Sequence, residues 1–542
     1  MLLRFAILVA GVSGALRTEC DVSTNGGKVP LVSRISDLLS PRPSSQYKTY
    51  CGATPPELET WHSEEPCDEG LLFVAPGEVA RGTTTDEGAD VEGPAIFRTN
   101  GELVWTQSGW GRTRDLRVQA VGDRSYMTFW RGASGVDDGA GGSYVLLDQS
   151  YEMVKEIRPI GEISSRPVEL KLTDNGTAII VMHNITQTDR LFGGFQSGWI
   201  NDAIIQEVDL TTNKLVSEWR ASQHFDVIMS QVEIENQGRT RETAVDFFRA
   251  TSIDLDHHGN YVISSRNMCN AAAVRRSDGE VLWVLGGALN SFVDGSAGQA
   301  AAMVSSQGIA WHGDSILLLL GGGHLPEVEG RAGRRTHVRA IHIDTAANTT
   351  ALIRTYNTPV GVAASRGSPQ GSVQRLGSGN VFVGWGDSNL SAAAYTEYSP
   401  QGQMLCSARF REAARSAKFR NPTGGGGGRV VSKHAWTGAP TARPVMAVRP
   451  QEGALYVSWN GDTRTTAWLL RSNNTERRDG SLGARRVAAR TGFETRIPIP
   501  RDVGEVIEVV AVDAQGKTLV RSELIWSEGA SDRKYLSTPI HS

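Results

Sequence analysis

Eleven histidines are the residues of this chain best suited to acid–base, nucleophilic or metal chemistry. His257 and His258 lie in the turn DLDHHGN, which resembles the start of a calcium loop but lacks its later glutamate and remaining oxygen ligands. No histidine or cysteine spacing is typical of a zinc site. The five consecutive glycines at 424–428 are not followed by Gly-Lys-Ser/Thr, so they do not predict a phosphate-binding loop. The sequence therefore predicts no metal and no other cofactor.

The elements that must position any site are clearest in residues 247–285. Two pairs of β-forming runs flank the turns DHHGN and RRSDG, and this pattern is typical of two consecutive hairpins. Two such hairpins predict one four-stranded antiparallel sheet. A single sheet of this kind cannot bury both faces, so it needs similar neighbours.

The double hairpin recurs along the chain. Its second half is found six times, at 95–105, 144–157, 203–219, 271–283, 338–356 and 394–410. The first half precedes five of these, at 116–130, 168–184, 251–267, 309–320 and 372–385. Before the first copy only LLFVAP (71–76) is found, as if that unit were shortened or completed from elsewhere. Repeats at this spacing predict an all-β fold, a six-bladed β-propeller; a row of separate sandwiches is disfavoured because no linker divides the units before residue 411.

The domain organisation follows from where this pattern starts and stops. We predict a signal peptide at 1–15, an irregular segment at 16–66, the propeller at 67–410 and a basic, glycine-rich linker at 411–439. Short strands at 440–530 outline an immunoglobulin or fibronectin type III β-sandwich, followed by a tail at 531–542. The segment 221–246 is the largest insertion, and either a channel cover or an inert surface loop would fit its mixed polar composition.

Several features predict the secretory pathway. The N-terminus has the pattern of a cleavable signal, with one basic residue, the run FAILVAGV and small residues near position 14. No segment of the sequence has the ~20 apolar residues of a membrane span. Sequons occur at Asn175, Asn184, Asn348, Asn389 and Asn473. Five cysteines allow at most two internal bridges, and position alone suggests that Cys67 and Cys406 join the ends of the propeller. The net charge of -4 gives no indication of a nucleic-acid partner.

Several motifs together resemble the secreted arylsulfotransferase family, in its fungal-type branch. They are CDEGLLFVAP, LRVQAV…FWRG, GGFQSGWINDAIIQEVDL, DFFRATSIDLDHHGNYVISSRN and GEVLWVLGG, with VSWNGDT, TGFE and VDAQG near the end. The resemblance covers roughly residues 30–525. It implies a six-bladed propeller that moves sulfuryl groups between phenolic esters and phenols without a nucleotide donor, through a transiently sulfated histidine.

The chain departs from the family pattern at the positions that carry this chemistry. Where the family has histidines, this chain has Arg249 and Arg114, and Thr251 stands where a polar amide is usual. The nucleophile motif Gln-His-Asp reads Gln307-Gly308-Ile309. The anion-binding arginine of the family carries over to Arg266, which is followed by Asn267.

Arginine binds sulfate or carboxylate through paired hydrogen bonds but cannot serve as the nucleophile here. The resemblance therefore implies an anion pocket formed by Arg266, Arg249, Arg114, Thr251, Asn267 and Gln307. Ordinary ion pairing of Arg249 with Asp246, and of Arg114 with Asp115, is the alternative for two of these residues. His312, in the turn WHGD, and His324, after the run ILLLLGGG, are candidate substitute nucleophiles.

Three functions remain open from the sequence. The first is a secreted protein that binds a small anionic or phenolic ligand in the channel without sulfohistidine catalysis. The second is an active sulfotransferase that uses a displaced histidine. The third is a structural or adhesive extracellular protein.

Overall fold

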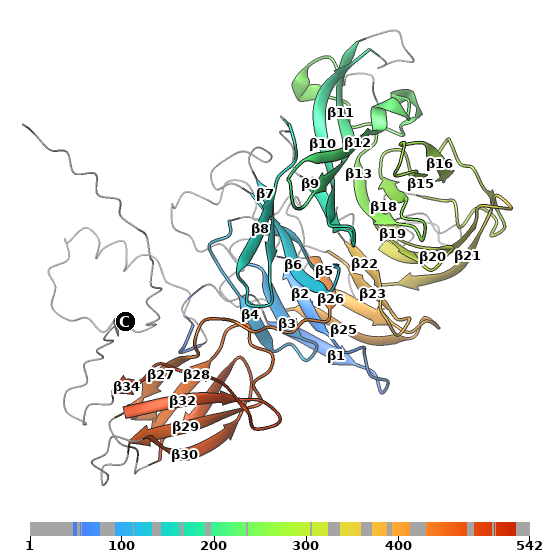
Figure 1. The fold of residues 1–542 in the computed structure, drawn as a ribbon. Coiled ribbons are helices and arrows are strands. Elements are labelled where there is room, and N and C mark those ends of the chain that lie inside the picture. The colour runs from blue at the N-terminus through green and yellow to red at the C-terminus, as the bar shows by residue number, and fades with distance from the viewer. Residues whose placement is uncertain are drawn as a thin grey trace, which may run out of the picture. The chain divides into compact units, whose positions relative to one another are not determined.

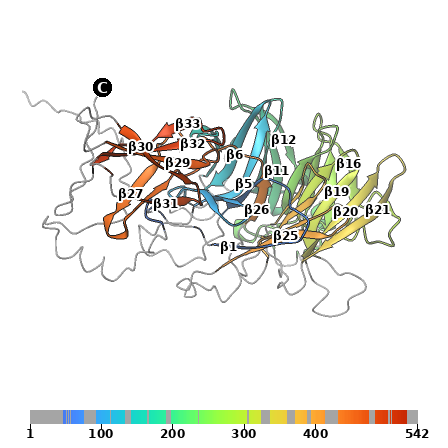
Figure 2. The ribbon, with the colours of Figure 1, turned by 90° about the horizontal axis from the view of Figure 1, so that it is seen from below.

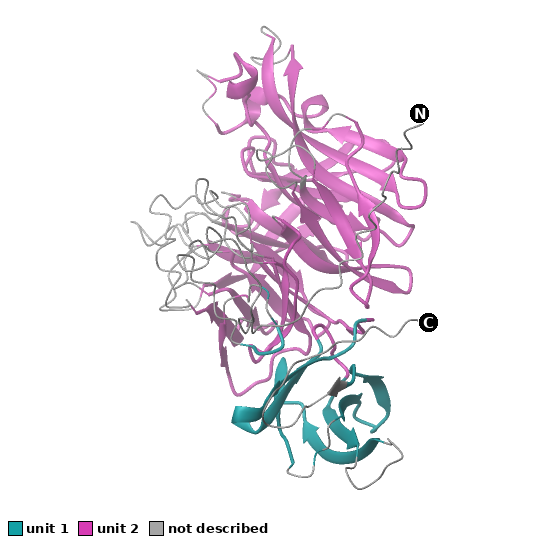
Figure 3. Cartoon of the chain, turned by 90° about the vertical axis from the view of Figure 1, so that its left-hand side faces the viewer, with its two compact units in different colours: residues 1–53, 442–459, 465–542 teal, residues 54–441, 460–464 magenta. Residues whose placement is uncertain are grey.

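The computed structural model describes residues 47–526 with gaps at 51, 53–54, 56, 76–92, 112, 133–141, 162, 164–166, 190–196, 233, 235–236, 304–305, 323–335, 359–370, 387–392, 412–429, 474–481, 501–502 and 504–505. The predicted signal peptide, the run of five glycines, the sequon at Asn389 and His324 lie outside the described residues. The described chain is all-β, as predicted, and divides into a larger unit (54–441 and 460–464) and a smaller unit (1–53, 442–459 and 465–542), shown in Figure 3.

The larger unit contains six sheets in its described residues, antiparallel apart from one short parallel pair in the fifth (Figure 1, Figure 2). Five of them pair the hairpins that the sequence predicted. The first two sheets are, in order of pairing, β26 (Val430–His434), β2 (Leu71–Ala75), β3 (Ala95–Arg98) and β4 (Leu103–Thr106), and then β5 (Thr113–Val121), β6 (Arg124–Arg131), β7 (Ser143–Leu147) and β8 (Met153–Ile157). The third and fourth sheets are β9 (Pro167–Leu172), β10 (Thr177–Thr188), β11 (Gly198–Asp209) and β12 (Leu215–Arg220), and then β13 (Ala250–Leu255), β14 (Tyr261–Ser265), β15 (Asn270–Val274) and β16 (Val281–Leu285). The fifth and sixth sheets are β18 (Ser306–His312), β19 (Ile316–Gly322), β20 (Thr336–Asp344), β21 (Thr349–Asn357) and β17 (Val293–Asp294), and then β22 (Ser372–Arg375), β23 (Val381–Gly384), β24 (Tyr395–Tyr398), β25 (Met404–Phe410) and β1 (Leu58–His62).

One edge strand of each sheet contacts the corresponding strand of the next sheet. The contacts run β5–β9–β13–β18–β22–β26 and return from β26 to β5, so these six strands form a closed ring. Apolar side chains fill the space between neighbouring sheets; for example, Trp130 and Tyr144 pack with Leu170 and Ile180 across the sheets that begin with β5 and β9. Burial of this kind stabilises by about 25 cal/mol per Å² of apolar surface, and it holds the ring strands at fixed spacing.

Strand β26 corrects one part of the sequence interpretation. Residues 411–439 read as a linker, but Val430–His434 pair antiparallel with β2 and take the ring position of its sheet. This strand is the missing part of the unit that begins with LLFVAP. Its short VVS run follows the five glycines, and only its pairing with a strand more than three hundred residues earlier identifies it.

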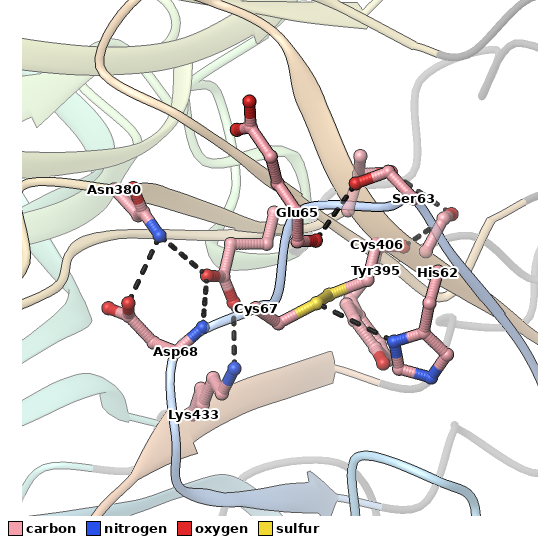
Figure 4. Close-up of a disulfide and its surroundings, with 12 residues drawn as sticks. His62, Ser63, Glu65, Cys67, Asp68, Asn380, Tyr395, Cys406 and Lys433 are labelled. Carbon is pink, nitrogen blue, oxygen red and sulfur yellow. Dashed lines mark hydrogen bonds and ion pairs between the residues drawn. A yellow bond between two sulfur atoms is a disulfide. The ribbon is translucent and has the colours of Figure 1, made fainter.

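The segment before the ring also differs from prediction. Residues 16–66 read as irregular, yet Leu58–His62 form β1 on the outer edge of β25. The sulfurs of Cys67 and Cys406 form a disulfide with a Cα–Cα distance of 6.1 Å, which confirms the pairing suggested by position. Figure 4 shows His62 beside this bridge, with Nδ1 3.7 Å from the Cys67 sulfur. The bridge therefore ties the entry of the first sheet to the last strand of the sixth.

A buried polar cluster lies at the same junction. The Glu397 carboxylate on β24 accepts hydrogen bonds from the Asp68 backbone N–H (2.8 Å) and the Asn380 amide (2.9 Å). Its second oxygen pairs with the Lys433 ammonium of β26 at 2.7 Å. Both charged side chains are almost fully buried, with exposed fractions of 1% for Lys433 and 0% for Glu397. One carboxylate thus joins three segments where the ring closes.

The insertion at 221–246 is firmly attached to the long β10–β11 ribbon. It contains the 3-10 turns η1 (Ala221–Gln223), η2 (Val227–Met229) and η3 (Arg241–Thr243). The backbone N–H of Asn201 donates to the Val245 carbonyl at 2.9 Å, and Phe225 and Val227 are buried in the adjoining core. The segment therefore packs as part of the fold and delivers Asp246 to the edge of the ring.

The smaller unit contains two antiparallel sheets that share one core. They comprise β27 (Val445–Arg449), β28 (Ala454–Ser458) and β31 (Glu494–Pro498), and β30 (Leu482–Ala489), β29 (Ala467–Asn473), β32 (Val506–Val512), β33 (Thr518–Arg521) and β34 (Ile525–Trp526), with the 3-10 turn η6 (Pro450–Glu452). Trp459 and Trp468 lie in that core with Leu455 and Ile507. In the described parts of both units, no helix combines the length and hydropathy that a membrane crossing requires.

Candidate functional site

The six ring strands surround a cavity of about 1140 Å³, which both polar and apolar side chains line. Residues from all six strands line it, together with residues of β10, the loop after β14 and the end of the 221–246 insertion. Because the ring strands run in the same direction, their starts meet at one end of the cavity and their ends at the other. Each end carries its own set of polar side chains.

The first end, called here the Arg266 end, is lined by Arg114, His183, Asp246, Arg249, Thr251, Arg266 and Gln307. Arg114, Thr251 and Gln307 come from the starts of β5, β13 and β18. Arg266 follows the end of β14, and its backbone N–H donates to the Arg249 carbonyl at 3.0 Å. The structure therefore brings five of the six predicted ligand-binding residues to one place.

Asn267 is the exception among the predicted residues. It is not among the residues that line the cavity, and its side-chain amide donates to the Asp246 carbonyl. This hydrogen bond holds the end of the 221–246 insertion against the loop after β14. Asn267 thus supports the site without facing it.

Three ring strands are irregular where they carry site residues. Register shifts fall between Arg114 and Arg117 on β5, between Ala250 and Ser252 on β13, and between Ser306 and Gly308 on β18. A β-bulge locally changes the direction of a side chain, and bulges are frequent beside active sites. Arg249 also has a left-handed backbone, with φ of 48°, which is uncommon for a residue other than glycine. The same distortion therefore recurs at the same end of three sheets.

The arginines at this end differ in how they are paired. Arg249 forms an ion pair with Asp246 at 2.6 Å, so the ordinary-pairing alternative is correct for this contact. Asp115 pairs with Arg117 at 2.5 Å, and the expected pair with Arg114 is not the one observed. The side chain of Arg266 has no hydrogen bond or ion pair with any described residue. Burial and the nearby Arg249 charge lower the Arg266 pKa, and the Asp246 charge opposes this shift.

Three buried polar atoms at this end also lack a hydrogen-bond partner among the described residues: His183 Nε2, Asp246 Oδ1 and Gln307 Oε1. Gln307 is only 3% exposed. A buried polar atom without a partner costs roughly 1–3 kcal/mol. These three atoms lie at the same end of the cavity as Arg266.

Sequence reasoning missed His183 as a site residue. The sequon at Asn184 suggested an outward position, but adjacent residues on a strand face opposite sides, so His183 can line the cavity while Asn184 does not. Burial lowers the His183 pKa, Arg249 lowers it further, and Asp246 opposes the shift. The imidazole is therefore neutral at neutral pH.

The middle of the cavity is a belt of ion pairs with a structural role. Arg117 bridges Asp115 and Glu169, and Lys171 pairs with Asp254 at 2.9 Å. Burial raises the pKa of Asp115 to about 6, while Arg117 opposes the shift. The belt carboxylates accept hydrogen bonds from backbone N–H groups of the neighbouring ring strand: Asp115 from Leu170, Glu169 from Ile253 and Asp254 from Trp311. These carboxylates are engaged in holding the sheets together.

The second end, called here the Arg375 end, is lined by Asp174, His312, Arg375 and His434. The candidate nucleophile His312 thus lies at the opposite end of β18 from Gln307 and Gly308. Burial and the charge of Arg375 lower the His312 pKa. Burial lowers the pKa of His434 to about 3, with added effects of Arg117 and Lys171.

The depressed pKa of His434 predicts acid sensitivity. In the unfolded chain the His434 imidazole binds a proton near pH 6.5, whereas in the folded chain it does not. The free energy of unfolding is therefore highest above pH 6.5 and falls on acidification by about 1.4 kcal/mol per pH unit. Between pH 6.5 and 5 the wild type should lose about 2 kcal/mol more than His434→Gln, measured by urea unfolding at both values. Equal losses would show that His434 is protonated in the folded state.

The four sequons within the described residues differ in their surroundings. Asn175 and Asn348 are exposed, whereas Asn184 is half-buried on β10. Asn473 ends β29, and its side-chain oxygen accepts a hydrogen bond from the Val506 backbone N–H at 2.9 Å. Glycosylation at these positions remains a prediction.

A ring of mainly antiparallel sheets around an arginine-bearing cavity defines a propeller-like fold. A family model described as Arylsulfotransferase (ASST) matches residues 117–411, more than half of the chain, and the chain belongs to this family. A search of curated proteins found no match.

Solved structures with similarity are distant. They include a protein of unknown function from Bacteroides caccae, at 11% identity over 67% of this chain and 98% of that chain, with a TM-score of 0.37. The Cps50 (Swd1) β-propeller domain of Myceliophteria thermophila is similar at 10% identity over 74% of this chain and 96% of that chain, with a TM-score of 0.31. A streptogramin B lyase matches at 11% identity over 70% and 97%, with a TM-score of 0.32. Similarity at this level carries no information about activity.

Proposed function

We propose that this member of the arylsulfotransferase family binds an oxyanion-bearing aromatic ligand, of the aryl sulfate type, at the Arg266 end of the cavity, and that it does so without a sulfated histidine. The six sheets of the larger unit are the blades of a six-bladed propeller. The smaller unit is an immunoglobulin-like sandwich, and its two packed antiparallel sheets support this assignment.

The observation that carries the proposal is the unpaired guanidinium of Arg266 among buried polar atoms without partners. An arginine binds a sulfate group through two parallel, charge-assisted hydrogen bonds. Asp246 forms its ion pair with Arg249, and the Arg266 guanidinium forms none with a described residue, so its N–H donors are available for a ligand anion. The amide of Gln307 and the imidazole of His183 supply further hydrogen-bonding groups at the same end.

The position that the family resemblance assigns to the nucleophile is Gly308, which has no side chain. A Cβ atom placed there would lie 3.3 Å from the Gly371 carbonyl oxygen, which is tighter than usual. A side chain at this position would therefore require the Gly371 backbone to shift by a few tenths of an ångström. This supports binding without a covalent step at that position.

We further propose that the protein is secreted. The Cys67–Cys406 disulfide supports this location, because structural disulfides persist mainly in oxidising compartments. The N-terminal segment that predicts export lies outside the described residues. Cleavage of that segment is part of the proposal.

A second candidate function is an active sulfotransferase that uses His183. The specific observation in its favour is a neutral imidazole whose unpartnered Nε2 lines the cavity beside the Arg249–Asp246 pair. A neutral imidazole nitrogen can attack sulfur, whereas an imidazolium cannot. This replaces His312, which lies at the far end of the cavity from Arg266.

The two candidates are separated by one experiment with 35S-labelled 4-nitrophenyl sulfate as donor and phenol as acceptor. We expect saturable donor binding, no labelled phenyl sulfate, and no label on the denatured protein. Label that is trapped on the wild type and lost in His183→Gln would establish the second candidate. Absence of donor binding would contradict both and favour a structural role.

A further inference from the structure

The Arg375 end of the cavity has features of a site in its own right. On β18, Gln307 and His312 are five residues apart, which at 3.3 Å per residue places them about 16 Å from each other. The belt of ion pairs from Arg117 to Asp254 lies between the two ends. A ligand held at Arg266 therefore does not reach this end unless it is long.

Arg375 has the same unusual state as Arg266. Its side chain forms no hydrogen bond or ion pair with the described part of the chain, and its Nε atom is buried without a partner. The guanidinium lies against the turn after β22, since a Cβ on Gly379 would be 3.3 Å from Nη2. That turn restricts the side chain to a small set of positions at the edge of the cavity.

The neighbours of Arg375 complete a set of hydrogen-bonding groups. His312 is close enough for the Arg375 charge to lower its pKa. His434 adds a second imidazole whose Nε2 is buried without a partner. Asp174 lines this end and forms no ion pair with Arg375 among the described contacts, and the nearby carboxylate of Asp254 is paired with Lys171.

From this arrangement we infer that the Arg375 end is a second oxyanion site, which takes a sulfate group through Arg375 with hydrogen bonds from His312 and His434. The group is either inorganic sulfate or the sulfate of an ester. A cavity of about 1140 Å³ exceeds the usual size of a single small-molecule pocket, so two separate anions fit within it. This inference does not depend on the Arg266 site being occupied.

The test is isothermal titration of the full-length protein with inorganic sulfate and, separately, with 4-nitrophenyl sulfate. We expect two sites for inorganic sulfate in the wild type, one in Arg375→Gln and one in Arg266→Gln, with at least a tenfold loss of affinity at the altered site. Arg375→Lys should retain part of the affinity, because the charge remains while the paired geometry is lost. The ester titration shows whether the second site accepts only the free ion.

Arg354→Gln is the matched control, since Arg354 lies near this end on β21 but is not among the lining residues. Thermal melting of each variant confirms folding. A titration of Arg375→Gln that superimposes on the wild type, or a wild type with a single sulfate site removed by Arg266→Gln, would overturn the inference. An unchanged titration for Arg266→Gln would instead count against the proposed function and leave the second site standing.

Discussion

Arg266→Gln is expected to weaken binding of 4-nitrophenyl sulfate by roughly 10- to 100-fold, because a hydrogen bond to a charged group contributes about 1.5–3 kcal/mol. The same substitution should leave the melting temperature unchanged or slightly raised. Burial and Arg249 already disfavour the Arg266 charge in the ligand-free protein, and the Asp246 charge offsets only part of this effect. Loss of binding together with retained stability is the signature of a residue kept for a ligand. Titration calorimetry and thermal melting measure the two effects.

Arg275→Gln is the matched control for this prediction. Arg275 belongs to the same sheet, lies in the turn after β15 and pairs there with Asp278 and Glu280. It is not among the lining residues, so ligand affinity should not change. If Arg266→Gln binds the ester as tightly as Arg275→Gln does, the proposed anion site is wrong.

Lys433→Met is expected to lower the free energy of unfolding by about 3–5 kcal/mol, because it leaves the Glu397 carboxylate buried without its cation. The pair joins β26 to β24 where the ring closes, and Asn380 and the Asp68 backbone N–H bind the same carboxylate. Few substitutions outside the apolar core should cost as much. Urea unfolding followed by tryptophan fluorescence measures the change.

The double variant Lys433→Met with Glu397→Gln should recover most of this loss, since the neutral amide oxygen still accepts from Asn380 and Asp68. The exposed pair Arg409–Glu59, at 2.9 Å, provides the control. Arg409→Ala should cost at most about 1 kcal/mol because water screens that pair. A Lys433→Met variant no less stable than Arg409→Ala would mean that the ring closes without this contact.

Much of the fold was predictable because its signals are local. Alternating apolar runs broken by Asn-Gly and Asp-Gly turns predicted the hairpins, and each of the five complete repeats forms one sheet. The family resemblance, carried by short motifs, is confirmed by the match over 117–411. The positions of Cys67 and Cys406 at the two ends of the repeats indicated the bridge that closes the ring.

The sequence by itself thus determined the sheets, the family and five residues of the Arg266 end, because strand period and motif identity are written in consecutive residues. Only the tertiary structure decided that Val430–His434 complete the first sheet, since that pairing joins distant segments. It also decided that His183 faces the cavity, that Asp115 pairs with Arg117, and that Arg375 forms a second cationic end. The physical reason is register: a bulge or a shift of one residue turns a side chain to the opposite face, and it is set by the packing of neighbouring sheets.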